Sequence, residues 1–256
     1  MIYIFLFFCY YFITLMLPVT VTERTNTTGI PVEGIIIMDT EATCGPNINQ
    51  GTAWCSELVQ LSAIHYVADK DQILKQLHVF SCFVKPIENP QLTDYFLKLT
   101  EGSITQEMVN GGLDFCEALK TFNKWRLDNN LMRALCVFSG DYDFGFIMGT
   151  KLGLIPNQIK RQQHLVEGRL TEQDLVPYMK WINIKFLFKQ MVPELAKINT
   201  ESMTKHFGLE LSGTHHNALD DVESIANIAR ELIKLNPNLD WITPTTYWSS
   251  YDVYYN

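Results

Sequence analysis

Two acidic residues follow an apolar segment near the start of the chain. Asp39 and Glu41 stand directly after the run 35–38, separated by Thr40. Alternate side chains of an extended chain face the same side, so both carboxylates can reach one ligand. Carboxylates beside a buried strand repel each other and lose hydration, and a bound cation offsets both costs. The pair therefore predicts a site for a hard ion such as Mg²⁺ or Mn²⁺, although this spacing alone also arises by chance in acidic loops.

A second acidic pair opens an amphipathic segment near the C-terminus. The segment 218–234 carries one apolar stripe at helical spacing, made by Ala218, Val222, Ile225, Ala229, Leu232 and Ile233. Asp221 falls on that stripe, whereas Asp220 is turned about 100° away. An aspartate that faces the core needs a partner, and a metal shared with Asp39 would supply one. The alternatives are a helix cap for Asp221 and a solvated first-turn acid for Asp220.

A histidine precedes this helix. His216 stands on the loop before it, in the string His216-Asn217-Ala218-Leu219-Asp220-Asp221. An imidazole that titrates near neutrality can take a proton from a water molecule. His215 is adjacent and competes for the same role, and a structural role is the third alternative.

The middle of the chain offers a further acid. Asp141 and Asp143 follow an apolar segment that ends at Gly140. Either can cap the helix expected over 144–152, because aspartate is a preferred residue at helix N-termini. Helical phase does not choose between them.

Length and charge limit the class of protein. The chain has 256 residues and a formal net charge of -8, which fits one large domain or two small ones and shows no general basic surplus for nucleic acid. A phosphate-binding surface must then be local. Basic residues gather after Asp143 and form either such a groove or a solvated face: Lys151, Lys160, Arg161, Arg169, Lys180, Lys185 and Lys189. The six cysteines have no C-x-x-C spacing, which argues against a zinc site. Most lie in apolar stretches, which favours reduced, buried thiols, with disulfides as the alternative if the chain is secreted.

The N-terminal segment carries no charge in its first 22 residues. We expect residues 1–30 to be a hydrophobic leader (signal or anchor) and linker, 31–236 to be the folded domain, and 237–256 to be a tail. If Met1 is the true start, we expect the protein to be membrane-anchored or secretory, with membrane association through residues 1–18. If translation starts later, we expect a cytoplasmic or nuclear localisation.

The remaining pattern predicts a mixed sheet. Three strands over 33–38, 58–67 and 78–84 have short connections, which favours an antiparallel meander. Short helices are expected over 93–99 and 105–109, a longer helix over 113–127, and a fourth strand over 134–138. The segment 181–188 fits a strand or a helix. Strands first, followed by alternating helix and strand, are typical of an α/β fold with helices on the faces of a mixed sheet.

Together these strings resemble the DEDDh 3′–5′ exonuclease superfamily, and within it the enhanced-RNAi and histone-mRNA 3′-end exoribonuclease family. The segments that carry the resemblance are 36–44, 99–106, 180–184 and 216–221. The resemblance implies an α/β, ribonuclease H-like fold with a mixed five-stranded sheet and helices on both faces, with 31–236 as the exonuclease domain. The family has an aromatic residue before its middle acid, which selects Asp143 after Tyr142. Its H-x-x-x-x-D spacing selects His216.

The same resemblance implies an activity. Two Mg²⁺ or Mn²⁺ ions would be held by Asp39, Glu41, Asp143 and Asp221, and His216 would activate the attacking water. Thr40, Ala42 and Tyr142 would contact the substrate. The implied reaction removes nucleoside 5′-monophosphates from the 3′ ends of small or structured RNAs, with single-stranded or 3′-overhang RNA as the expected partner. The alternatives are a DNA-directed exonuclease of the same superfamily and a non-catalytic RNA-binding module. The loop 99–105 carries an extra residue, and the family's SAP module has no counterpart.

Overall fold

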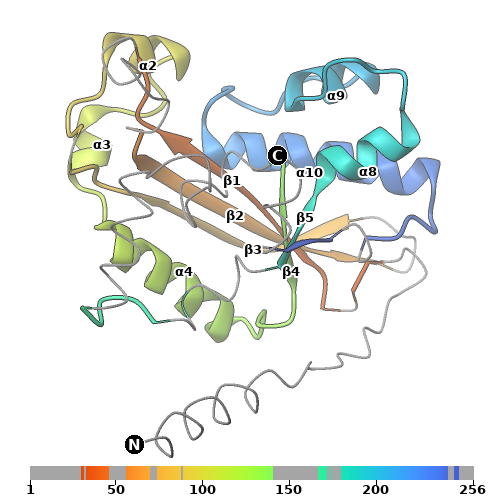
Figure 1. The fold of residues 1–256 in the computed structure, drawn as a ribbon, viewed down its shortest axis with the longest axis horizontal. Helices are drawn as coiled ribbons and strands as arrows, with labels where there is room; N and C mark the ends of the chain where they lie inside the picture. Colours follow the sequence, from red (N-terminus) through yellow and green to blue (C-terminus); the bar gives the residue numbers. More distant parts are fainter. Residues whose placement is uncertain are drawn as a thin grey trace, which may run out of the picture.

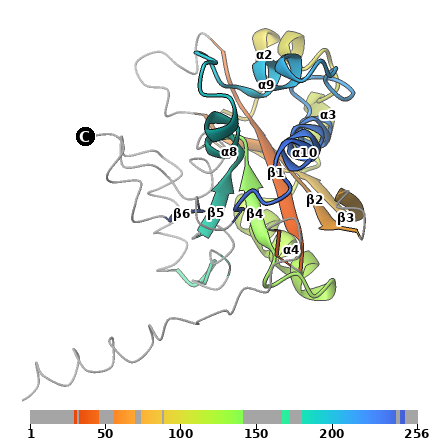
Figure 2. The ribbon, with the colours of Figure 1, turned by 90° about the vertical axis from the view of Figure 1, so that its right-hand side faces the viewer.

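The computed structural model describes residues 30–31, 33–45, 56–69, 74–87, 89–140, 167–171, 174, 180–241 and 245–247. Within these ranges one sheet has the strand order β3-β2-β1-β4-β5-β6. Helices lie on both of its faces (Figures 1 and 2). The strands are β1 (Ile35–Ala42), β2 (Leu58–Ala68), β3 (Leu74–Phe83), β4 (Leu135–Phe138), β5 (Lys180–Asn183) and β6 (Thr245–Tyr247).

The sheet is mixed, as the sequence predicts. β1, β2 and β3 form the expected antiparallel meander. β4 pairs in parallel with β1 on one side and with β5 on the other. Strands β1 to β5 thus make the predicted five-stranded arrangement, and β6 from the predicted tail adds an antiparallel sixth strand beside β5.

The described helices begin at side chains that accept backbone N–H groups, which replaces hydrogen bonds missing at helix starts. Asp114 caps α4 in this way and Asn217 caps α10. The segment 181–188 contains both alternatives, because Asn183 ends β5 and its side chain caps α8. The helices are α2 (Asp94–Leu99), α3 (Gln106–Asn110), α4 (Phe115–Asp128), α8 (Ile184–Met191), α9 (Thr200–His206) and α10 (Ala218–Leu235).

Helix α9 was not expected from the sequence, which has no long apolar stripe there. Its start is marked instead by a capping box, in which the side chains of Asn199 and Ser202 each accept the other residue's backbone N–H. The helix expected over 144–152 lies outside the described residues.

Strand β1 divides the core into two layers. Ile36 and Met38 pack in the cluster that contains Phe122 of α4. Ile35 and Ile37 pack in the cluster that contains the apolar stripe of α10. The alternation of side chains along a strand therefore directs the odd-numbered positions of β1 toward α10.

β1 is longer than the sequence predicts, and this decides where the acidic pair lies. The expected strand ended at Met38, but pairing with β2 continues to Ala42. Pairing with β4 stops earlier, at Ile37↔Val137. Asp39 and Glu41 are therefore held in a strand, beyond the end of the parallel neighbour and on the side toward α10.

A buried histidine stabilises the start of β1. His65 is 3% exposed, and its Nε2 atom lies 2.8 Å from the carbonyl oxygen of Glu33. Its Nδ1 atom is buried without a hydrogen-bond partner in the described part of the chain. The ring stacks on His78. Burial, opposed by the Glu33 hydrogen bond and aided by His78, lowers the pKa of His65 below its ordinary value of 6.5.

This lowered pKa predicts an acid-sensitive fold. Below pH 6.5 the unfolded chain takes up a proton at His65 that the folded chain does not, so the free energy of unfolding should fall as pH drops from 7 toward the folded-state pKa. Urea unfolding at several pH values measures the slope. His65→Gln should flatten it, whereas His78→Gln should leave most of it in place. An unchanged slope in His65→Gln would remove His65 as the cause.

In the part of the chain that the structure describes, no helix has the length and apolar character needed to cross a membrane. Residues 1–29 of the predicted leader lie outside the described ranges. The described cysteines, Cys44, Cys82, Cys116 and Cys136, are free thiols.

Candidate functional site

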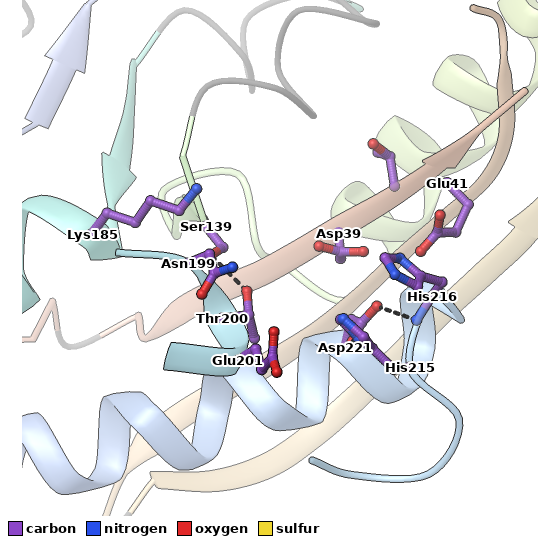
Figure 3. Close-up of a pocket in the computed structure, with 11 residues that line it drawn as sticks. Asp39, Glu41, Ser139, Lys185, Asn199, Thr200, Glu201, His215, His216 and Asp221 are labelled. Carbon is purple, nitrogen blue, oxygen red and sulfur yellow. Dashed lines mark hydrogen bonds and ion pairs between the residues drawn. The ribbon is translucent and has the colours of Figure 1, made fainter. Parts of the chain in front are cut away.

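A cavity of about 320 Å³ opens beside the C-terminal half of β1 and beyond the carboxyl end of β4. Ligands of open α/β sheets commonly bind at this edge, because loops and helix starts gather there. Figure 3 shows the side chains that surround it. The cavity is lined by Asp39, Thr40, Glu41, Ser139, Lys185, Asn199, Thr200, Glu201, His215, His216 and Asp221.

Three predicted acids meet in this cavity. Ligand oxygens of Asp39, Glu41 and Asp221 all lie within 4.8 Å of one another. Glu41 is 9% exposed and Asp221 is 5% exposed, and Asp39 is partly buried. Carboxylates this close repel one another where little water screens them, and a divalent cation offsets that repulsion. The oxygen-only donor set fits a hard divalent ion.

A buried glutamine joins the two elements that carry these acids. Gln60 of β2 lies opposite Glu41 in the strand register and is 2% exposed. Its Oε1 atom accepts the N–H of Ala218 at 2.9 Å, and its Nε2 atom donates to Asn217 Oδ1 at 3.5 Å. The first turn of α10 is thereby fixed to the sheet beside Glu41. Gln60 was missed by reasoning from the sequence, although a polar residue within an apolar strand is a signal for such a contact.

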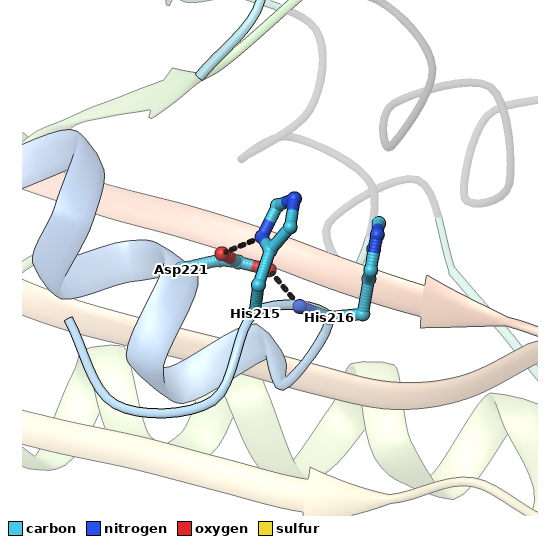
Figure 4. A group of neighbouring side chains, drawn as sticks. All are labelled: His215, His216 and Asp221. Atoms are coloured by element: carbon cyan, nitrogen blue, oxygen red, sulfur yellow. Dashed lines mark hydrogen bonds and ion pairs between the residues drawn. The ribbon is translucent and has the colours of Figure 1, made fainter. Parts of the chain in front are cut away.

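Both oxygens of Asp221 accept hydrogen bonds from the loop before α10. Oδ1 lies 2.9 Å from His215 Nδ1, and Oδ2 accepts the backbone N–H of His216 at 3.0 Å. Figure 4 shows one carboxylate oxygen directed at the His215 ring and the other at the His216 backbone nitrogen. The helix cap considered for Asp221 is wrong, because Asn217 occupies that position. Asp220 is more than a solvated acid, since its Oδ2 atom accepts the N–H of Thr214 at 2.8 Å.

The loop holds its two histidines against each other. His216 has a φ of 65°, in the left-handed region that non-glycine residues rarely adopt. Its ring stacks on His215 with a centroid separation of 3.9 Å. Burial lowers the pKa of His216, His215 lowers it further, and Asp221 opposes the shift. The neutral imidazole, which can accept a proton, is therefore favoured near pH 7.

The other predicted site residues lie in different places. Thr40 lines the cavity, whereas Ala42 does not and packs in the core on the α4 side. Asp143, Tyr142 and the competing Asp141 lie outside the described residues. The fourth acid and the aromatic contact therefore stay predictions.

Several cavity residues were missed by sequence reasoning, because they come from the end of β4 and the start of α9. The hydroxyl groups of Ser139 and Thr200 lie 2.9 Å apart and join these two segments. Asn199 belongs to the capping box of α9 and Glu201 to its first turn. Recognition of that capping box would have placed a helix start here, but not its contact with β4.

The described members of the predicted basic cluster lie in different places. Lys185 lines the cavity. Lys189 donates to the carbonyl oxygens of Pro193 and Leu195, and Arg169 pairs with Asp114 at 3.4 Å. Lys151, Lys160, Arg161 and the side chain of Lys180 lie outside what the structure describes. Of the cluster members described, Lys185 alone lines the cavity.

The family model RNase_T, described as an exonuclease, matches residues 36–229. The chain belongs to this exonuclease family. The match begins within β1 and ends within α10, so it includes the elements that carry Asp39, Glu41 and Asp221.

Several curated proteins with exonuclease names are similar to this chain. It is 26% identical to ERI1 exoribonuclease 3 of Homo sapiens over 202 residues, which is 77% of this chain and 52% of the relative. It is 21% identical over 239 residues to 3′-5′ exonuclease eri1 of Schizosaccharomyces pombe, which is 85% of this chain and 73% of the relative. The chain thus spans about half the length of the ERI1 exoribonuclease 3 proteins that it matches.

The fold is shared with solved structures. The nuclease domain of 3′hExo, a DEDDh family member bound to rAMP, aligns with a TM-score of 0.64 and 24% identity. The alignment covers 81% of this chain and 95% of that chain. The predicted ribonuclease H-like fold and the resemblance to the DEDDh and enhanced-RNAi exonucleases are confirmed, and the DEDDh family is metal-dependent.

The meeting of the acids predicts cation-dependent stability. A ligand present at 100 times its Kd should add about 2.7 kcal/mol to the free energy of unfolding. Titration with Mg²⁺ or Mn²⁺, followed by thermal unfolding, measures this gain. Asp39→Asn should lose most of it, because one ligand of the shared site is removed. Asp128→Asn, an exposed ion-pair partner of Lys124, is the control and should keep it. An equal cation-dependent gain in stability in both variants would show that Asp39 does not bind the cation.

Proposed function

We propose that this chain is a metal-dependent 3′-to-5′ exoribonuclease that releases nucleoside 5′-monophosphates from single-stranded or 3′-overhang RNA. The observation that carries the proposal is the convergence of Asp39, Glu41 and Asp221 beside His216 in one cavity of an exonuclease-family domain. The names of the ERI1 relatives support RNA as the substrate, and the rAMP bound to 3′hExo supports a mononucleotide product.

Asp39, Glu41 and Asp221 would hold Mg²⁺ or Mn²⁺, with Asp143 as the proposed fourth ligand. Two such ions would supply Lewis acidity that stabilises charge on the attacking and leaving oxygens of an in-line displacement. The hydrogen bonds from His215 and from the His216 backbone would fix the orientation of the Asp221 carboxylate.

His216 would be the general base. Its imidazole is kept neutral by burial and by His215, and it lines the same cavity as the acids. It would take one proton from the attacking water as the new phosphorus–oxygen bond forms. The leaving 3′ oxygen of the preceding nucleotide would be protonated in turn, so the products are a shortened RNA and a 5′-monophosphate.

A parallel digestion tests the substrate. RNA and DNA of the same sequence, labelled at the 5′ end, should be incubated with the protein and Mg²⁺ or Mn²⁺, and again with chelator. We expect the RNA to shorten stepwise from its 3′ end and the chelator to stop the reaction. Faster loss of DNA would favour the DNA-directed alternative. RNA that is retained on a filter but left intact would favour a non-catalytic binding module.

Substitution of the histidine tests the base. His216→Ala should lower the rate of RNA cleavage by roughly 10²–10⁴-fold, the usual range for loss of a general base. The cation-dependent gain in thermal stability should persist, because the three acids remain. His78→Ala, on strand β3 away from the cavity, is the control. A near-normal rate for His216→Ala would assign proton removal to another group.

A further inference from the structure

Lys185 enters the cavity from the start of α8. It is partly buried and follows Ile184, the first residue of that helix. Its ammonium group lies against Gly140, the second residue after β4, which has a φ of 107°. A Cβ atom at position 140 would come within 2.6 Å of Lys185 Nζ. Glycine at this position therefore leaves room for the ammonium group.

The Lys185 ammonium has no hydrogen bond or ion pair to any residue in the described part of the chain. Lys189, one turn along the same helix, shows the contrast, because its ammonium is bound to two carbonyl oxygens. Figure 3 shows Lys185 at the opposite end of the cavity from Glu41 and His216, beside Ser139 and Asn199. A partly buried cation that has no partner among the described residues is stabilised when it binds an anion from outside the chain.

We propose that Lys185 binds a phosphate of the RNA strand next to the phosphate that is cleaved. The inference rests on the proposed function, which places the cleaved phosphate at the carboxylate end. RNA carries one phosphate per nucleotide, so a strand that enters this cavity brings a second anion with it. Lysine serves such contacts as a flexible point charge. Contacts to phosphates hold register and orientation without reading sequence.

This contact has a function that the carboxylates cannot supply. The end of the cavity that holds Asp39, Glu41 and Asp221 is acidic, and it attracts RNA only through bound cations. A protein cation at the far end holds the strand so that its terminal linkage reaches the cations. Lys185 is therefore a positioning residue, and its loss should raise KM more than it lowers kcat.

Equilibrium binding tests the proposal without cleavage. In an Asp39→Asn background, the affinity for a short fluorescent single-stranded RNA is measured over a range of salt concentrations. Lys185→Gln should weaken binding and reduce the slope of log K against log salt by about 0.7, the value for one phosphate contact on single strands. Lys185→Arg should restore the slope. Lys205→Gln, an exposed lysine of α9 outside the cavity lining, makes the same charge change and should leave it unaltered.

An RNA with one uncharged methylphosphonate linkage locates the contact. The methylphosphonate is placed one linkage before the terminal linkage. The protein with Lys185 should bind this RNA more weakly than it binds normal RNA. Lys185→Gln protein should bind both RNAs equally, because the partner charge is already gone. An unchanged salt slope, or equal losses from Lys185→Gln on both RNAs, would overturn the proposal. If the expected couplings appear but the parent protein cleaves no RNA, the exoribonuclease proposal fails while the phosphate contact stands.

Discussion

The structure is organised around three carboxylates that are brought within 4.8 Å of one another. Negative charges this close, with Glu41 and Asp221 buried, cost free energy that apolar side chains in the same places would not. A chain that carries such a cluster must offset the cost, and a divalent cation does so directly. Hydrogen bonds from Gln60 and from the histidine loop hold the acidic segments in place.

Two elements that are far apart in the sequence, β1 and α10, bring the three acids together. β1 directs Asp39 and Glu41 toward α10 because its odd-numbered residues face that helix. α10 directs Asp221 back toward β1 because that residue lies on the helix face that packs against the sheet. Gln60 fixes the two elements to each other, and the histidine loop holds both oxygens of Asp221. The acids are thus oriented by the protein itself, which lowers the cost of reorganising them when a ligand binds.

The convergence of the three acids could be predicted only in part from the sequence. The period of two in β1 and the helical phase of Asp221 are local properties, so both faces could be read from the residues. The length of β1 could not be read from the residues, because the strand continues by pairing with β2 beyond the last residue that pairs with β4. Gln60, Ser139 and Thr200 escaped notice for the same reason. Each acts through a contact with a residue distant in sequence or in a neighbouring element, and no periodic pattern marks such contacts. The choice between Asp141 and Asp143 rests on the family resemblance, since both lie outside the described residues.

The central claim is that Asp39, Glu41 and Asp221 jointly hold a divalent cation. Crystals soaked in Mn²⁺ and measured at the manganese absorption edge test it most directly. The account predicts an anomalous difference peak between the three carboxylates, within about 2.0–2.6 Å of oxygens from both β1 and α10. A peak bound only to His215 and His216, or no peak in this cavity, would contradict it.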